Sequence, residues 1–201
     1  MSYLVLVRHG ESLWNKKGIW AGKTDISLSD KGIGEAQTAA SLIKDIHFDN
    51  VFASSLKRAR ETLEYMRPTL HVPQTYATDK ALDERDYGDL TGKNKEELKK
   101  EVGVDQYLKW RRSFSTPPPH GESLKDVYNR VVPYYKKEIL PIIQQGKNVL
   151  IVAHGNSLRA LIKFIEQISD SEIPNIEIST GSVIVYSVDK QGTIVQKEVR
   201  E

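Results

Sequence analysis

The sequence contains no cysteine. Disulfide bonds, thiolate metal sites and a cysteine nucleophile are therefore excluded, and the absence is compatible with a reducing cytosol. Long apolar runs are also lacking, because the run YLVLV at 3–7 is too short for a signal peptide or a membrane span. We therefore expect a cytoplasmic protein that does not associate with a membrane.

An excess of charge of either sign is missing as well. The 29 Lys and Arg residues nearly balance the 27 Asp and Glu residues, which leaves a formal net charge of +2. This balance gives no support to a nucleic-acid partner, so any anion site must be local. The 201 residues, 39% of them hydrophobic, fit one globular domain and exclude global disorder. We expect a single domain over 1–201.

Apolar runs typical of strands alternate with helical periodicity along the chain. The pattern predicts strands at 3–8, 51–53 and 148–153, a closing β-hairpin at 182–188 and 193–199, and helices at 30–46, 56–66, 94–112, 123–143 and 156–168. Strands that are apolar on both faces predict a three-layer α/β/α sandwich with a mainly parallel sheet. The segment 94–121 is interpreted as an insertion that covers another part of the domain.

Two of the predicted strands end in the same dipeptide, His-Gly. His9 and Gly10 follow the first strand, and His154 and Gly155 follow the strand at 148–153. Ligands of parallel sheets bind beyond the carboxyl ends of the strands, and glycine lets a ligand approach the backbone closely. A helix that starts there directs free N–H groups at the same place. Two imidazoles in this setting indicate an anion site.

Other interpretations of these residues remain open at this point. A single histidine after a strand is more often structural than catalytic, and paired histidines are common zinc ligands. Arg8 argues against a metal because its guanidinium would repel a cation, whereas arginine binds phosphate oxygens in a bidentate manner. Arg58, at the start of the helix after the second strand, is expected at the same sheet edge, although taken alone it fits a solvated helix face.

Longer motifs carry a resemblance to a known family. The stretch LVRHGES at 6–12, with Trp14 and Asn15 after it, resembles the signature of the histidine phosphatase superfamily. The stretches WRRS at 110–113, GESLKD at 121–126 and HGNSLR at 154–159 make the chain similar to the cofactor-dependent phosphoglycerate mutases. The likeness extends over nearly the whole chain and implies the fold of that family.

The resemblance also implies roles for particular residues. His9 would be the nucleophile that becomes a phosphohistidine, with Arg8, Arg58 and His154 around the transferred phosphoryl group. Glu84 matches the general acid of the family, although the residues alone would allow its neighbours Asp83 and Asp86 equally well. The implied substrate-binding residues are Asn15, Gly22, Tyr87, Lys95, Arg111, Arg112, Gly155 and Asn156.

Two members of the implied substrate-binding set also fit other interpretations. Lys95, taken alone, belongs to a lysine-rich solvated face. Arg111 and Arg112 are adjacent on a predicted helix and are expected to point in different directions, so that one of them is structural.

The implied reaction interconverts 3-phosphoglycerate and 2-phosphoglycerate in glycolysis and gluconeogenesis. The resemblance implies 2,3-bisphosphoglycerate as the priming phosphoryl donor, no metal, a small phosphorylated substrate, and a homo-oligomer that is a dimer or a tetramer. One alternative is a phosphatase that hydrolyses a small phosphorylated metabolite, which the segment 110–112 together with Tyr87 and Lys95 disfavours. Another is a non-catalytic phosphate- or phosphoprotein-binding module, which the intact set of His9, Glu84 and His154 disfavours.

Overall fold

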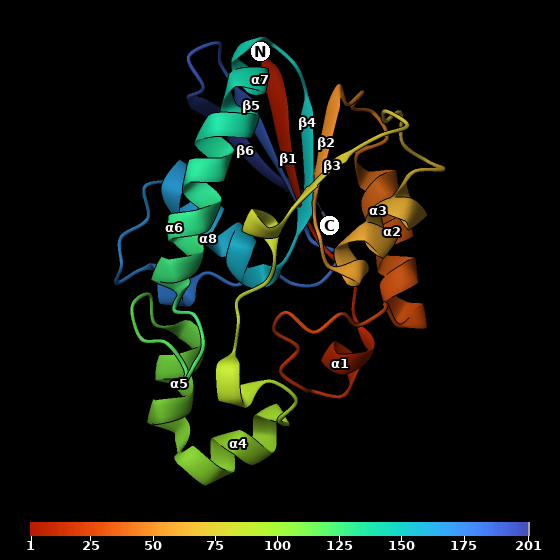
Figure 1. Cartoon of the computed structure of the whole chain (residues 1–201). Coiled ribbons are helices and arrows are strands. Elements are labelled where there is room, and N and C mark those ends of the chain that lie inside the picture. The colour runs from red at the N-terminus through yellow and green to blue at the C-terminus, as the bar shows by residue number, and fades with distance from the viewer. Residues whose placement is uncertain (201) are drawn as a thin grey trace.

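A six-stranded sheet with the strand order β3-β2-β4-β1-β5-β6 forms the centre of the computed structural model, which describes residues 1–200 (Figure 1). The pairs β1–β4, β2–β4 and β2–β3 are parallel, whereas β1–β5 and β5–β6 are antiparallel. This confirms the mainly parallel sheet. The strands are β1 (Ser2–Arg8), β2 (Asn50–Ser54), β3 (Ala77–Asp79), β4 (Val149–Ala153), β5 (Val183–Val188) and β6 (Ile194–Arg200).

Helices cover both faces of this sheet (Figure 1). Alternate residues of β1 explain why: Leu4 and Leu6 pack in one apolar core, and Val5 and Val7 pack in the other. A strand that is apolar on both faces needs a helical layer on each, which confirms the predicted three-layer sandwich. One layer contains α2 (Asp30–Leu42) and α3 (Lys57–Met66), and the other contains α6 (Leu124–Tyr134), α7 (Leu140–Gln144) and α8 (Gly155–Ile165).

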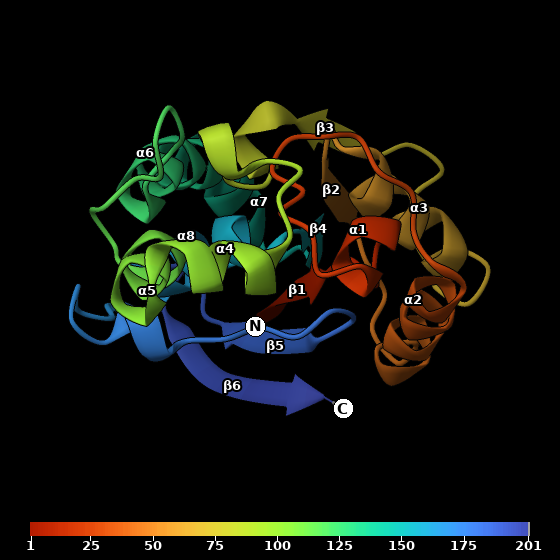
Figure 2. The ribbon, with the colours of Figure 1, turned by 90° about the horizontal axis from the view of Figure 1, so that it is seen from below.

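Further helices lie beyond the carboxyl ends of the parallel strands. Seen from below, α1 (Leu13–Lys16), α4 (Lys95–Val102) and α5 (Val104–Arg112) cross this end of the sheet (Figure 2). A small apolar cluster of Trp20, Leu90, Leu98 and Tyr107 packs α4 and α5 against the preceding loops. Short 3₁₀ turns occupy Lys80–Leu82, Gly88–Leu90 and Ile173–Asn175.

Several elements differ from their predicted bounds. The helix predicted at 30–46 ends at Leu42. The prediction was too long because Ile43 and Ile46, which are buried in the turn after the helix, continue its apolar spacing. The helix predicted at 123–143 contains a π-helical turn at Tyr135–Ile139, between two prolines that cannot donate a backbone hydrogen bond. The helix predicted at 156–168 is shorter and ends at Ile165.

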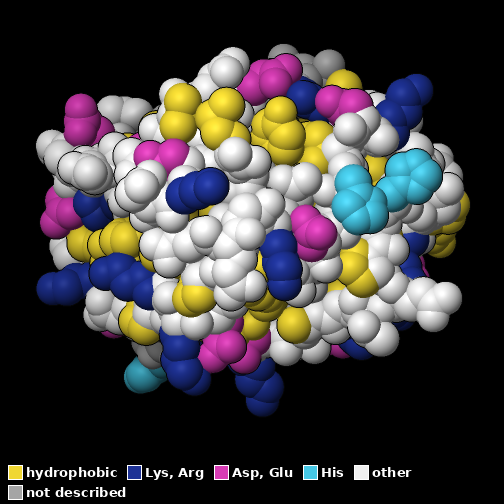
Figure 3. Space-filling model, turned by 90° about the horizontal axis from the view of Figure 1, so that it is seen from above, with side chains coloured by type: hydrophobic (Ala, Val, Ile, Leu, Met, Phe, Trp, Pro, Cys, Tyr) yellow, Lys and Arg dark blue, Asp and Glu magenta, His cyan; other side chains and the backbone are white. Residues whose placement is uncertain are grey.

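The opposite end of the molecule has a mixed surface. Viewed from above, lysine and arginine side chains are interspersed with acidic ones and with small apolar patches (Figure 3). Across residues 1–200, no helix combines the length and the apolar character needed to cross a membrane.

Two glycines fix how the start of α2 crosses the turn after β1. A Cβ atom on Gly10 would lie 2.1 Å from the Gly32 carbonyl oxygen, and a Cβ atom on Gly32 would lie 2.1 Å from the Glu11 carbonyl oxygen. The Ser29 hydroxyl accepts from the Gly32 N–H at 3.1 Å and donates to the Glu11 carboxylate at 2.7 Å. Only glycine permits backbones at this distance, so the pair sets the position of the turn that carries His9.

The glycine contact predicts a large difference between two alanine variants of the same helix. Gly32→Ala should lower the free energy of unfolding by about 3 kcal/mol, because the added methyl group overlaps backbone atoms. Gly34→Ala, where a Cβ meets no atom within 4 Å, should be neutral or raise that free energy by about 0.5–1 kcal/mol. Urea unfolding of both variants measures the difference, and equal stabilities would contradict the contact.

Candidate active site

Two buried histidines lie side by side where β1 and β4 end. The strands pair in parallel with Arg8 opposite Ala153, and the His9 N–H donates to the Ala153 carbonyl at 2.9 Å. His9 and His154 are therefore the next residues on two adjacent strands. Their ring centres are 4.9 Å apart, and both side chains are buried. The structure thus brings the two predicted histidines together.

The hydrogen bond of His9 determines which of its nitrogens is free. Its Nδ1 lies 2.6 Å from the Gly10 carbonyl oxygen. A carbonyl can only accept, so Nδ1 carries the proton and Nε2 has the free lone pair. Burial, followed by the charges of Arg58 and Arg8, holds the pKa of His9 well below 6.5. The imidazole is consequently neutral at physiological pH and able to act as a nucleophile.

His154 is held from the opposite side. Its Nε2 lies 2.7 Å from Ser54 Oγ, and its Nδ1 has no hydrogen-bond partner among residues 1–200. Burial is the largest cause that lowers its pKa well below 6.5, with Arg58 and His9 next. Nδ1 is therefore a buried nitrogen with a free lone pair, on a neutral ring.

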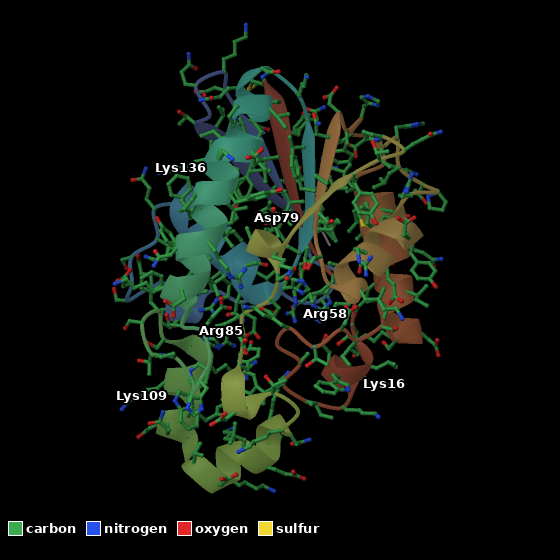
Figure 4. The ribbon with its side chains drawn as sticks, viewed as in Figure 1. Lys16, Arg58, Asp79, Arg85, Lys109 and Lys136 are labelled. Atoms are coloured by element: carbon green, nitrogen blue, oxygen red, sulfur yellow. The ribbon has the colours of Figure 1, made fainter. Side chains whose placement is uncertain are left out.

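Arg8 and Arg58 add two cations to the histidine pair (Figure 4 shows Arg58). Arg58 is almost fully buried and donates to the carbonyl oxygens of Thr24 at 2.9 Å and of Gly22 at 2.8 Å. The Arg8 guanidinium lies against the first residue of α8, since a Cβ on Gly155 would be 3.5 Å from its Cζ atom. Burial lowers the pKa of both groups, yet arginine remains charged at neutral pH.

Three acidic residues follow β3, and their contacts distinguish them. Glu84 is buried, and its Oε1 accepts from the Arg85 N–H at 2.8 Å and from the Asn156 N–H, in the first turn of α8, at 3.1 Å. Within residues 1–200 both bonds use Oε1, which leaves Oε2 able to exchange a proton. Asp83 accepts from Ser54, and Asp86 accepts from the Gly88 N–H at 2.9 Å. Of the three acids, Glu84 alone lines the cavities described next.

Two adjoining cavities of about 60 and 90 Å³ lie beyond the strand ends. They share the side chains of Arg8, Trp20, Glu84, Tyr87 and Lys95. The smaller, inner cavity also includes His9, Asn15, Gly22 and Arg58, and the larger, outer cavity includes Arg111, Arg112, Gly155 and Asn156. Every site residue predicted from the sequence thus lines a cavity, apart from His154, which packs against His9.

Polar contacts fix the walls that the two cavities share. The Tyr87 hydroxyl accepts from Asn156 Nδ2 at 2.8 Å, and the Tyr87 ring lies 4.4 Å from the Trp20 ring. The Lys95 ammonium lies 5.7 Å from the Trp20 ring centre, and its pKa is lowered by burial and then by Arg111 and Arg8. A lowered pKa marks Lys95 as part of a cationic cluster rather than of a solvated face.

Asn15 holds the loop that forms one side of the inner cavity. Its Oδ1 accepts from the Ser12 N–H at 3.1 Å and from the Ser12 hydroxyl at 2.8 Å, which closes a capping box at the start of α1. The Asn15 side chain also lines the inner cavity.

Arg111 and Arg112 were expected to point in different directions, but both side chains reach the same carboxylate. Both lie in the last turn of α5, and both pair with Glu177, at 3.6 Å and 2.8 Å. Because the helix ends at Arg112, the two side chains can turn toward the same carboxylate. Glu177 also lines the outer cavity, so an acidic group occupies the neighbourhood of both arginines.

Sequence reasoning missed two further cations near this site. Arg85 is fully buried, its Nε and Nη1 atoms have no partner among residues 1–200, and its guanidinium lies 4.8 Å from the Tyr87 ring centre (Figure 4). Arg159 donates to Asn156 Oδ1 at 3.0 Å, and burial lowers its pKa to about 10. Arg159 lies three residues after Asn156 on α8, so helical spacing could have found it. Glu177 lies outside every motif and gave no signal.

The arrangement has the chemistry of phosphoryl transfer. It combines a neutral imidazole, two arginines, Arg8 and Arg159, whose Nε atoms have no partner among residues 1–200, and the Glu84 carboxyl group, all of which line the two adjoining cavities. Across residues 1–200, no group of three or more His, Cys, Asp or Glu side chains could hold a metal ion.

Comparisons with known proteins agree with this geometry. The family model described as histidine phosphatase superfamily (branch 1) matches residues 4–199. A 2,3-bisphosphoglycerate-dependent phosphoglycerate mutase from Beijerinckia indica is 45% identical over 199 residues, which cover 98% of this chain and 96% of that protein. A phosphoglycerate mutase from Schizosaccharomyces pombe is 46% identical over 200 residues, covering 98% and 94% of the two chains.

Solved structures show the same fold. A mycobacterial glucosyl-3-phosphoglycerate phosphatase in complex with VO3 superimposes with a TM-score of 0.83, covering 100% of this chain and 98% of that chain, at 24% identity. The site geometry, the family model and the relatives confirm the resemblance found in the motifs. The chain therefore belongs to branch 1 of the histidine phosphatase superfamily and, within it, to the phosphoglycerate mutases.

Proposed function

We propose that the protein interconverts 3-phosphoglycerate and 2-phosphoglycerate through a phosphohistidine at His9. The observation that carries this proposal is the pair of adjoining cavities. The inner cavity holds the nucleophile and Arg58, and the outer cavity holds Arg111 and Arg112. A substrate with a phosphate at one end and a carboxylate at the other needs cations at both places, whereas hydrolysis of a simple phosphate ester needs only the first.

The first half of the reaction uses the inner cavity. His9 Nε2 attacks phosphorus in line, the P–N bond forms, and the bond from phosphorus to the leaving oxygen breaks. Arg8 and Arg58 neutralise the charge that develops on the phosphoryl oxygens, and His154 donates to these oxygens once its Nδ1 carries a proton. Glu84 gives its proton to the leaving oxygen and then, as a carboxylate, takes a proton from the next attacking hydroxyl.

The second half depends on the outer cavity. Arg111, Arg112 and Lys95 hold the carboxylate while the free hydroxyl of a monophosphoglycerate attacks the phosphohistidine, so that the P–N bond breaks and the bisphosphate forms. The bisphosphate then turns, and its other phosphoryl group is presented to His9. Tyr87 and Asn156 form the wall between the two positions, and Asn15, Gly22 and Gly155 bring amide groups to the anions. The α4–α5 segment then excludes water, which would divert the phosphoryl group to hydrolysis.

The unpaired guanidinium nitrogens fit a ligand with several negative charges. Arg8 Nε and Arg159 Nε are buried without a partner among residues 1–200, and both arginines line the outer cavity. Buried arginine donors are normally paired, so these atoms suit the oxygens of a bisphosphate. In this proposal 2,3-bisphosphoglycerate supplies the phosphoryl group that primes His9, no metal takes part, and the enzyme acts in the cytoplasm as a homo-oligomer on small phosphorylated substrates.

A coupled assay tests the proposal directly. Conversion of 3-phosphoglycerate, followed through enolase, should be stimulated by a trace of 2,3-bisphosphoglycerate and should release little free phosphate. His9→Ala should abolish conversion and acid-labile labelling, because the nucleophile is lost, whereas His71→Ala, on the exposed surface, should leave both intact. Phosphate release without isomer conversion would identify a phosphatase, and substantial conversion by His9→Ala would exclude His9 as the nucleophile.

The pH dependence of His9 phosphorylation follows from its low pKa. The reactive form is the neutral imidazole, and the pKa is held well below 6.5. As the pH falls through 6.5, His9 therefore stays neutral, and the rate declines only when the pH reaches the lowered pKa. Single-turnover phosphorylation measured between about pH 5 and pH 8 checks this. A half-maximal rate near pH 6.5 would show that His9 titrates as an exposed histidine does.

Arg111→Ala should separate binding in the outer cavity from chemistry in the inner one. Turnover of 3-phosphoglycerate should fall about tenfold or more, because a charge-assisted contact to the carboxylate is lost, while priming of His9 should fall less. Arg60→Ala, on the exposed face of α3, is the matched control. Steady-state kinetics and the rate of labelling give both quantities, and equal losses would rule out a recognition role for Arg111.

A further inference from the structure

A buried carboxylate lies behind His154, on the side of the ring that holds Ser54. The Asp83 side chain is buried and accepts from Ser54 Oγ at 2.7 Å, from the Ser55 N–H at 2.9 Å and from Ser55 Oγ at 2.8 Å. Ser54 Oγ is in turn 2.7 Å from His154 Nε2. An uninterrupted hydrogen-bonded chain thus connects Asp83 to the second histidine of the site.

The direction of each hydrogen bond in this chain is determined by its ends. A carboxylate can only accept, so the single hydroxyl proton of Ser54 is directed to Asp83. Ser54 Oγ must then accept from its other neighbours, which are the Leu56 N–H at 3.1 Å and His154 Nε2. His154 therefore carries its proton on Nε2 and leaves Nδ1 free, whereas His9 carries its proton on Nδ1 and leaves Nε2 free. The two imidazoles are held in opposite tautomers.

We propose that Asp83 is a positioning residue that acts through Ser54 on His154. It holds the ring in the Nε2–H tautomer, and its negative charge stabilises the imidazolium that forms when Nδ1 takes up a proton. This role rests on the proposed function, in which His154 donates to the transferred phosphoryl group. The proton comes from a singly protonated phosphate group, whose O–H bond breaks as the Nδ1–H bond forms, and it returns when the group leaves.

The charges around His154 explain why a carboxylate is needed there. Arg8 and His9 reach it from the end of β1, Arg58 from α3, and Arg130 from α6, and all four oppose a positive charge on the ring. Glu84 lies on the ligand side of the site, where it lines both cavities. Asp83 acts from behind the ring, where a bound anion would not reach.

Arg130 fixes the position of the carboxylate. Its guanidinium donates to the carbonyl oxygens of Asp83 at 2.9 Å and Glu84 at 3.1 Å, and it pairs with Glu122 at 3.1 Å. The backbone that carries both acids is therefore anchored to α6. Among residues 1–200 the Asp83 side chain has no direct cation partner, and it accepts hydrogen bonds from the two serines.

The variant Asp83→Asn separates charge from shape. It keeps the size of the side chain and an oxygen that accepts hydrogen bonds, but it removes the negative charge. The turnover number for phosphoglycerate should fall about tenfold or more while KM changes by less than about twofold, because the loss affects the transferred group and not the outer cavity. Asp79→Asn, which alters the cap of the turn just before Asp83, is the matched control and should keep wild-type kinetics.

Nitrogen-15 NMR of the histidines reads the effect without turnover. In the wild-type protein His154 should show the Nε2–H tautomer and should gain a proton at Nδ1 when orthovanadate is added as a phosphate mimic. In Asp83→Asn that protonation should require a lower pH. The proposal is overturned if Asp83→Asn changes turnover but leaves the His154 tautomer and its vanadate-dependent protonation as in the wild-type protein, because Asp83 would then be only structural. It is also overturned if Asp83→Asn has wild-type kinetics.

Ser54→Ala supplies an independent test if Asp83→Asn does not fold. It breaks the connection and leaves the carboxylate in place, so His154 should lose its fixed tautomer in the same NMR measurement. If both variants fold, the double variant should be no slower than the slower single variant, because the two residues act on one path. Additive losses would contradict the relay. If the wild-type protein shows the NMR coupling but does not isomerise phosphoglycerate, the proposed function fails and the relay stands.

Discussion

The site depends on the parallel register between β1 and β4. Side chains alternate between the two faces of a strand, so a shift of one residue would move every side chain to the other face. With Arg8 opposite Ala153, both histidines leave the sheet at the same level, and their rings meet at 4.9 Å. The apolar residues on both faces of β1 enforce this register, because they must match two different helical layers. The core and the reactive pair are therefore specified by the same residues.

The register also places positive charge in a buried region at the carboxyl ends of the parallel strands. Arg58 and Arg85 are almost completely buried. Arg58 donates to the carbonyl oxygens of Thr24 and Gly22, and Arg85 donates to that of Arg111. Two further nitrogens of Arg85 have no partner among residues 1–200. Burial of a cation without a counter-ion is costly, and an anionic substrate removes that cost when it binds. Burial, followed by the charge of Arg58, holds the pKa of both histidines well below 6.5 in the free protein. In the proposed function, one electrostatic arrangement thus binds the phosphate and keeps His9 in its neutral, nucleophilic form.

Much of this could be predicted from the sequence because the patterns were local. The strand-His-Gly corners follow from a few consecutive residues, and the parallel sheet follows from strands that are apolar on both faces and alternate with helices. β3 was missed because Ala77–Asp79 is short, polar and largely exposed, and its pairing with β2 leaves no periodic signal. Glu177 was missed because it meets Arg111 and Arg112 only through the tertiary fold. Such contacts depend on which loops the fold brings together in space, and neither composition nor residue spacing predicts this.

The neighbouring acids after β3 show how position decides chemistry. Asp83 and Glu84 are consecutive residues, and the backbone of Asp83 is extended, so their side chains leave in opposite directions. The Asp83 carboxyl group accepts hydrogen bonds from hydroxyl and amide donors of Ser54 and Ser55. Glu84 Oε1 accepts from the Asn156 N–H in the first turn of α8, and the Glu84 side chain lines both cavities. In the mechanism that we propose, these two carboxyl groups therefore have different tasks: Glu84 exchanges protons with the substrate, and Asp83 stabilises the positive charge of His154.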